Sequence, residues 1–234
     1  MIFHSFFVII KIGDYMKKIL IILLCIFVVG CSTKKEEKNI SGGWDITKLD
    51  KISIKEDELK IFNNANEDKE LKPIVLLAKQ VVSGTNYMFL CQKDNKYKIV
   101  VVYNNLENIS TIKSITDFDI TKYTNENKEI NKKESVGSFD VVLNKNIKLD
   151  EKTQKIFDEA SEKITGTTYY PIAVLGKQTV SGTNYALLAF GTPSTKELVN
   201  NTNTGVYILT LYEDLHGTCE IVSSSYIDLS KYNK

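Results

Sequence analysis

Lys79-Gln80-Val81-Val82-Ser83-Gly84-Thr85-Asn86-Tyr87 is followed, 98 residues later, by Lys177-Gln178-Thr179-Val180-Ser181-Gly182-Thr183-Asn184-Tyr185, which is the same nonapeptide with one change. Pro73 and Pro171 have the same spacing, so the match extends upstream of the nonapeptide. A repeat of roughly 100 residues is too long for a solenoid unit and is the size of a small domain. The sequence therefore predicts two tandem copies of one domain.

A helix followed by strands is predicted in each copy. In the second copy, apolar residues at helical spacing begin after Asp150, which suits an N-cap, and end before Gly166, which suits the C′ position. Apolar and β-branched runs then predict four strands in each copy, at 74–82, 85–92, 96–103 and 109–115 and at 172–180, 183–190, 206–212 and 220–226. We therefore expect an α+β fold with two tandem domains, each one α-helix packed on a four-stranded antiparallel β-sheet with a short leading strand.

The N-terminal segment has the features of a secretory signal. Met16-Lys17-Lys18 gives a positive start, and residues 19–29 form an apolar run too short to span a bilayer. The run ends in Gly30-Cys31, which resembles the lipobox of bacterial lipoproteins. That resemblance implies cleavage before Cys31 and a lipid on its thiol, which would anchor the protein on the extracytoplasmic face of a bacterial membrane. The alternative is a secreted protein with a cysteine there by chance.

These features predict the domain organisation. Residues 1–30 are interpreted as an N-terminal extension and signal peptide, with Met16 as the true start. The other predicted segments are a lipidated cysteine and flexible tether at 31–42, a first domain at 43–123, a charged linker at 124–136 and a second domain at 137–234.

Composition and motifs argue against several classes of function. The formal net charge of +1 gives no field that would attract nucleic acid. The sequence has no Gly-x-Ser-x-Gly elbow, no metal-ligand spacing and no phosphate-binding glycine loop, so we predict no catalytic residue, metal or cofactor, and a protein that is not an enzyme. Beyond the N-terminal segment His216 is the only histidine, and it has no counterpart in the first copy. Cys91 and Cys219 either form a disulfide or are two small buried side chains.

Gln-x-Val-x-Gly running on into Thr-Asn-Tyr, in a chain with this order of helix and strands, resembles the cystatins, and the stefin branch most. The resemblance covers residues 43–123 and 137–232. It implies a cystatin-like fold in each copy and reversible inhibition of papain-like cysteine proteases, with no catalytic residue in the inhibitor. By this resemblance the protease-binding residues would be Gly43, Gln80, Val81, Val82, Ser83 and Gly84 in the first copy and Gly137, Gln178, Thr179, Val180, Ser181 and Gly182 in the second.

The sequence departs from the family pattern in the second hairpin, where cystatins often carry Pro-Trp. No Pro-Trp occurs, and residues 104–106 and 214–216 take its place. Two hypotheses follow: a surface-anchored inhibitor of papain-like proteases, or a non-inhibitory cystatin-fold module that binds another surface protein. If the chain inhibits, we expect the first copy to be the stronger, because Val81 is more apolar than Thr179. We also expect Gly84→Glu to abolish that inhibition without unfolding the domain.

Overall fold

The computed structural model describes residues 44–46, 54–124, 139–142, 147–194 and 204–232, all within one compact unit, Ile40–Lys234. The first repeat contains α2 (Glu56–Ala65), β1 (Lys72–Val82), β2 (Gly84–Lys93), β3 (Lys96–Asn104), β4 (Ser110–Phe118) and α3 (Thr121–Thr124). The second contains β5 (Asp140–Val141), α4 (Glu151–Ser161), β6 (Thr167–Val180), β7 (Gly182–Pro193), β8 (Gly205–Glu213), β9 (Cys219–Tyr226) and the 3₁₀ turn η2 (Leu229–Tyr232). None of the helices in these ranges is long and apolar enough to cross a membrane.

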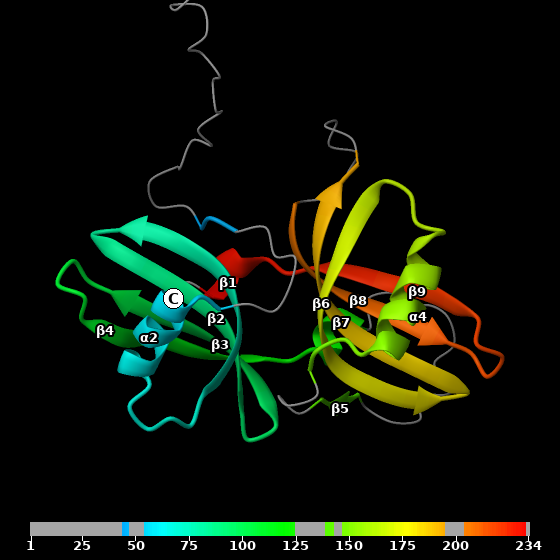
Figure 1. Ribbon diagram of the computed structural model, residues 1–234, viewed down its shortest axis with the longest axis horizontal. Coiled ribbons are helices and arrows are strands. Elements are labelled where there is room, and N and C mark those ends of the chain that lie inside the picture. The colour runs from blue at the N-terminus through cyan, green and yellow to red at the C-terminus, as the bar shows by residue number, and fades with distance from the viewer. Residues whose placement is uncertain (1–43, 47–53, 125–138, 143–146, 195–203, 233–234) are drawn as a thin grey trace, which may run out of the picture. The chain divides into compact units, whose positions relative to one another are not determined.

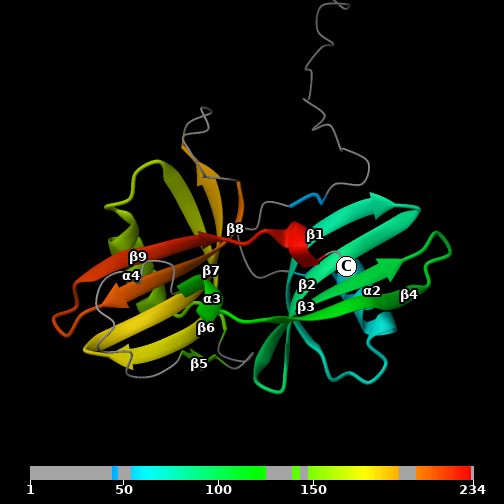
Figure 2. The same cartoon turned by 180° about the vertical axis from the view of Figure 1, so that it is seen from behind.

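Both repeats build their sheets in the same order. The first sheet has the order β1-β2-β3-β4 and the second β5-β6-β7-β8-β9, with antiparallel neighbours throughout (Figure 1). The repeated nonapeptide is in the same register in both, since Gln80 is paired with Asn86 and Gln178 with Asn184. Figure 2 shows the same strand order from behind.

The predicted fold class, an α+β pair of separate helix-on-sheet domains, is wrong. The chain is mostly β, with one four-stranded and one five-stranded antiparallel sheet, and only α2 and α4 are longer than one turn in the part of the chain that the structure describes. The largest hydrophobic cluster also contains residues of both sheets, among them Leu77, Leu90, Leu175 and Leu188. The predicted linker at 124–136 lies outside the described residues except for Thr124, so the domain boundaries stay a prediction.

Burial on both faces of the sheets explains this error. Five consecutive residues of β1, Ile74–Ala78, are buried. In a strand, successive side chains point to opposite faces, so such a run needs a cover on each side. Leu76 belongs to a cluster with Phe62 of α2, whereas Leu77 belongs to the cluster shared with the second sheet. A helix on one face leaves the other face apolar, and each sheet therefore needs its counterpart.

Each helix is held by capping and by a small apolar face. Asp150 is the N-cap of α4, where its side chain accepts a hydrogen bond of 2.7 Å from the amide of Thr153, as predicted. In the first repeat the amide of Lys55 donates to Glu58, at 2.9 Å. Phe62 of α2 is fully buried and makes an edge-to-face contact with Phe89 at 5.0 Å between ring centroids. These contacts fix each helix on the outer face of its own sheet.

Candidate functional site

Two hairpin turns meet at one end of each sheet. In the first repeat the β1–β2 turn is centred on Ser83, and the β3–β4 turn comprises residues 105–109. Both lie at the same end, because Thr85 is paired with Asn104 and Asn104 with Ser110. We call residues 80–86 together with 104–110 the first tip, and the equivalent residues 178–184 together with 213–219 the second tip. The structure thus brings the Gln-x-Val-x-Gly motif of each repeat beside a second hairpin.

The glycine of each motif is required by the backbone. Gly84 has φ of +122° and Gly182 of +129°, values that side chains other than hydrogen rarely allow. A Cβ atom on Gly84 would lie 2.5 Å from the carbonyl oxygen of Asn104, and Gly182 is equally confined by Glu213. The expectation that Gly84→Glu would leave the domain folded is therefore wrong, because the new side chain would meet backbone atoms of the neighbouring hairpin.

The glutamine of the motif is used inside the sheet. Gln80 is 7% exposed, and its side-chain oxygen accepts a 2.6 Å hydrogen bond from the side-chain nitrogen of Asn86 across the strand pair. Gln178 accepts the same bond from Asn184 at 2.8 Å. This pair of polar side chains, at the second and eighth positions of the nonapeptide, thus ties the two strands of the hairpin together.

A tyrosine locks the two hairpins of each tip to one another. The Tyr103 hydroxyl donates to the carbonyl oxygen of Ser83, and the Tyr212 hydroxyl donates to that of Ser181. These tyrosines were missed as site residues from the sequence, although their separation of 109 residues marked them as equivalent. Because each lock joins the first hairpin to the second, the tip is ordered before any partner binds.

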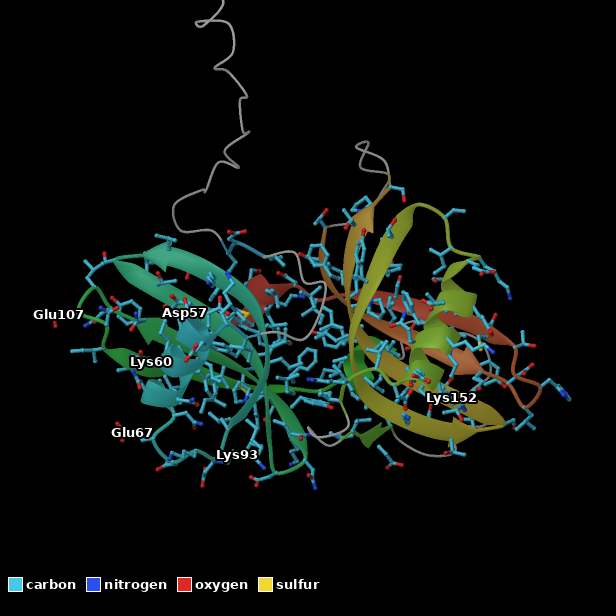
Figure 3. The ribbon with its side chains drawn as sticks, in the orientation of Figure 1. Asp57, Lys60, Glu67, Lys93, Glu107 and Lys152 are labelled. Atoms are coloured by element: carbon cyan, nitrogen blue, oxygen red, sulfur yellow. The ribbon has the colours of Figure 1, made fainter. Side chains whose placement is uncertain are left out.

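The side chains left exposed at the first tip are apolar. Val81 is 61% exposed, Val82 42% and Leu106, on the second hairpin, 81%. Beside them a cavity of about 510 Å³ is lined by Val82 and Tyr103 together with polar side chains that include Asn86 and Lys113. Glu107, labelled in Figure 3, follows Leu106 on the same turn. A tip with an apolar crest and polar flanks can enter a narrow cleft in another protein.

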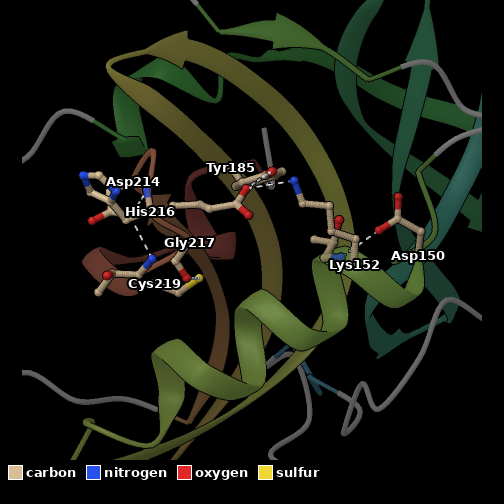
Figure 4. A network of polar contacts seen from close by, with 10 residues as sticks. Asp150, Lys152, Tyr185, Asp214, His216, Gly217 and Cys219 are labelled. Atoms are coloured by element: carbon tan, nitrogen blue, oxygen red, sulfur yellow. Dashed lines mark hydrogen bonds and ion pairs between the residues drawn. The ribbon is translucent and has the colours of Figure 1, made fainter.

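The second tip is more polar. Thr179 is exposed, Val180 is half-buried, and Leu215 is the one large exposed hydrophobic residue among its described side chains, at 79%. Glu213 accepts a 2.8 Å hydrogen bond from Tyr185 and lies 3.0 Å from the Lys152 ammonium (Figure 4). Burial alone would raise the pKa of Glu213. The hydrogen bonds from Tyr185 and Lys152 and the charge of Lys152 together lower it by more, so the pKa of this carboxyl lies below its usual value.

The second hairpins of the two tips have turns with the same hydrogen-bond pattern, made by an amide side chain in the first tip and by a carboxylate in the second. The Asn105 side-chain oxygen accepts hydrogen bonds from the amides of Glu107 and Ile109 at 3.0 and 2.8 Å. The Asp214 carboxylate accepts from the amides of His216 and Thr218, both at 2.8 Å (Figure 4). Hydrogen bonding by the Thr218 amide is the main reason why the pKa of Asp214 is lowered.

Three predicted site residues, Gly43, Gly137 and Cys31, lie outside the described residues. The segments that follow the two glycines pair with the first long strand of each sheet. The Asp45 amide donates to the Lys79 carbonyl at 2.7 Å, and Asp140 is paired with Lys177. The leading segment of each repeat therefore runs beside the strand that carries the motif.

The described cysteines and acidic residues form neither a disulfide nor a metal site. Cys91 and Cys219 are both free thiols, buried in different hydrophobic clusters, so the disulfide alternative is not formed. Burial raises the pKa of Cys91, which leaves its thiol protonated and unreactive. Within the described ranges no group of His, Cys, Asp and Glu side chains could hold a metal ion.

The tips carry exposed apolar side chains on a hydrogen-bonded frame, an arrangement suited to contact with another protein. In comparisons with known proteins, no family model matches the chain, and no curated protein matches it.

Proposed function

We propose that this protein is a reversible inhibitor of papain-like cysteine proteases that acts through its hairpin tips, the first tip most strongly. The observation that supports this most is the ordered apolar crest formed by Val81, Val82 and Leu106 at the end of the first sheet. A rigid crest loses little conformational entropy on docking, and exposed apolar residues gain from burial in a cleft. The resemblance of the motif to the cystatins supplies the class of partner.

We further propose that the chain is a lipoprotein attached through Cys31 to the outer face of a bacterial membrane. The apolar run before Cys31 and the polar stretch after it support this placement. Residues 31–42 would then hold the folded unit away from the lipid surface. Mass spectrometry of membrane fractions would detect the acylated Cys31, and a Cys31→Ala variant that stays equally membrane-bound would contradict the anchor.

The second candidate function is a non-inhibitory binding module on the same scaffold. A specific observation favours it: the glutamine, asparagine and glycine of the motif are engaged in the hairpin itself, so the motif has a structural reason to occur twice. On this account the tips bind a surface protein that is not a protease. The two candidates share the interface and differ in the partner.

The deciding experiment is a titration of the soluble chain, residues 32–234, against a papain-like protease with a fluorogenic substrate. We expect reversible inhibition that the paired change Val81→Asp and Val82→Asp weakens by about tenfold or more, because both charges would enter the cleft. Ile115→Asp is the matched control, since Ile115 is 51% exposed on β4 away from the tip turns. An absence of inhibition by folded wild-type protein would reject the inhibitor and leave the binding module.

A further inference from the structure

The contacts between the two repeats fix which parts of the sheets overlap. We call the end of each sheet opposite its tip the base; in the first sheet it carries the β2–β3 turn at Asp94 and Asn95. Tyr97 lies at this base, and its hydroxyl is 2.8 Å from the carbonyl oxygen of Leu175, in the middle of β6. Ile120, which follows β4 at the same base, lies against Gly176, also in the middle of β6.

The reverse contact also exists. Ile46 follows the residue that pairs with Lys79 in β1, and its side chain lies against Gly205, at the base of the second sheet. Between these contacts the hydroxyls of Tyr123 and Tyr232, which occupy equivalent positions in the two repeats, are 3.0 Å apart. A contact between equivalent residues is expected where two copies are related by an approximate two-fold axis.

This pattern determines where the tips lie. If the strands of both sheets pointed the same way, the base of one sheet would lie on the base of the other and the middle on the middle. Instead each base lies on the middle of the other sheet. The two sheets therefore overlap in part, and the tip of the first sheet extends beyond the overlap in one direction while the tip of the second extends in the opposite direction. Seven residues separate Tyr97 from Asn104 and five separate Leu175 from Val180, which places each tip roughly 20 Å beyond the contact.

Among the residues that the structure describes, neither tip is covered by the other repeat. The motif residues of both tips are absent from the cluster that joins the sheets, and Val81, Leu106 and Leu215 are all highly exposed. A partner at one tip would therefore extend away from the other. The buried Tyr97 hydrogen bond and the shared core hold the two tips in a fixed relation, unlike two domains on a flexible linker.

We propose that one molecule holds two papain-like protease molecules at the same time, one at each tip, and so acts as a bivalent bridge. The inference rests on the proposed function, which supplies the partner. On a membrane surface such a bridge would retain two protease molecules per anchor, and partners that are themselves multivalent would be held more tightly than either tip alone allows.

The test is the mass of the complex, measured by light scattering after gel filtration of the 32–234 chain with excess papain-like protease. We expect two protease molecules per wild-type chain. The paired Val81→Asp and Val82→Asp variant should bind one molecule, through the second tip, and Leu215→Asp should bind one, through the first. All changed side chains are exposed or half-exposed, and thermal unfolding would verify that the variants fold.

The outcomes separate the two proposals. One protease per wild-type chain would overturn the bridge and leave the proposed function in place, whether the two tips compete or only one of them binds. The variants tell these cases apart, since a single active tip is lost in one variant and unaffected in the other. No complex at all would overturn both the inhibitor and the bridge.

Discussion

The first and second tips have the same frame and different surfaces. Each has a confined glycine, a cross-strand Gln–Asn pair and a tyrosine that joins its two hairpins. The exposed positions differ, since Val81 is replaced by Thr179 and the Asn105 turn by the Asp214 turn. The shared part of the motif therefore builds the turn. On the proposed function, differences in binding strength between the tips would come from the few side chains that the frame leaves exposed.

The shared frame gives the largest expected effect. Gly84→Ala should lower the free energy of unfolding by about 3 kcal/mol, because it combines a positive φ with a backbone clash. Gly182→Ala should cost a similar amount. Gly217→Ala is the matched control: its φ is +84° but no atom lies within 4 Å of the new Cβ, so about 1 kcal/mol is expected. Denaturant unfolding measures all three. Equal losses of unfolding free energy for Gly84→Ala and Gly217→Ala would contradict the close approach of Gly84 to the Asn104 carbonyl oxygen.

A smaller loss of stability is expected when the Tyr97 hydrogen bond between the repeats is removed. Tyr97 of the first repeat hydrogen-bonds across to the second, whereas Val206 occupies the equivalent position there. Tyr97→Phe should cost about 1 kcal/mol of unfolding free energy, because the buried hydroxyl contact is lost while the Leu175 carbonyl keeps its hydrogen bond from the Val142 amide. Val206→Ile, a change with no polar partner to lose, is the comparison in the other repeat. A single unfolding transition in each variant is expected from the shared core, and two separate transitions would contradict it.

One of the two exposed differences between the tips can be removed by a methyl-for-hydroxyl exchange. Thr179→Val gives the second motif the same sequence as the first, and its side chain points to solvent in both forms. We expect a several-fold gain in inhibition by the second tip, measured in a chain whose first tip carries Val81→Asp and Val82→Asp. Stability should stay within about 0.5 kcal/mol of the parent. An unchanged inhibition constant would mean that this position does not contact the partner.

The smallest effect is a pH dependence confined to the second tip. Because hydrogen bonds lower the folded-state pKa of Asp214, its stabilising contribution is present above its unfolded pKa, near 3.8, and is lost as pH falls through the folded value. The protection of the Thr218 amide against exchange, relative to its intrinsic rate at each pH, should therefore fall below about pH 4, while that of Ile109, held by the neutral Asn105, should not. Asp214→Asn should abolish the difference, and its persistence in that variant would assign the titration to another group.

The sequence predicted the local structure better than its assembly. The repeat located both hairpin turns, and Asp150 marked the start of α4. The run Ile74–Ala78 did not reveal that a second sheet covers one face, because five apolar residues in a row are compatible with a buried strand in many settings. Nor did it show that Tyr103 and Tyr212 reach back to the turn of the first hairpin in each tip, since that contact depends on the direction of a side chain and not on the apolar pattern of the strands.

We propose that the exposed apolar crest of the first tip binds a papain-like protease more strongly than the second tip does. The most direct measurement compares inhibition constants for the paired variant Val81→Asp and Val82→Asp with those for Thr179→Asp and Val180→Asp. We predict a loss of about tenfold or more for the first pair and a smaller loss for the second. Equal inhibition by both variants and the wild type, with all three proteins folded, would contradict the account.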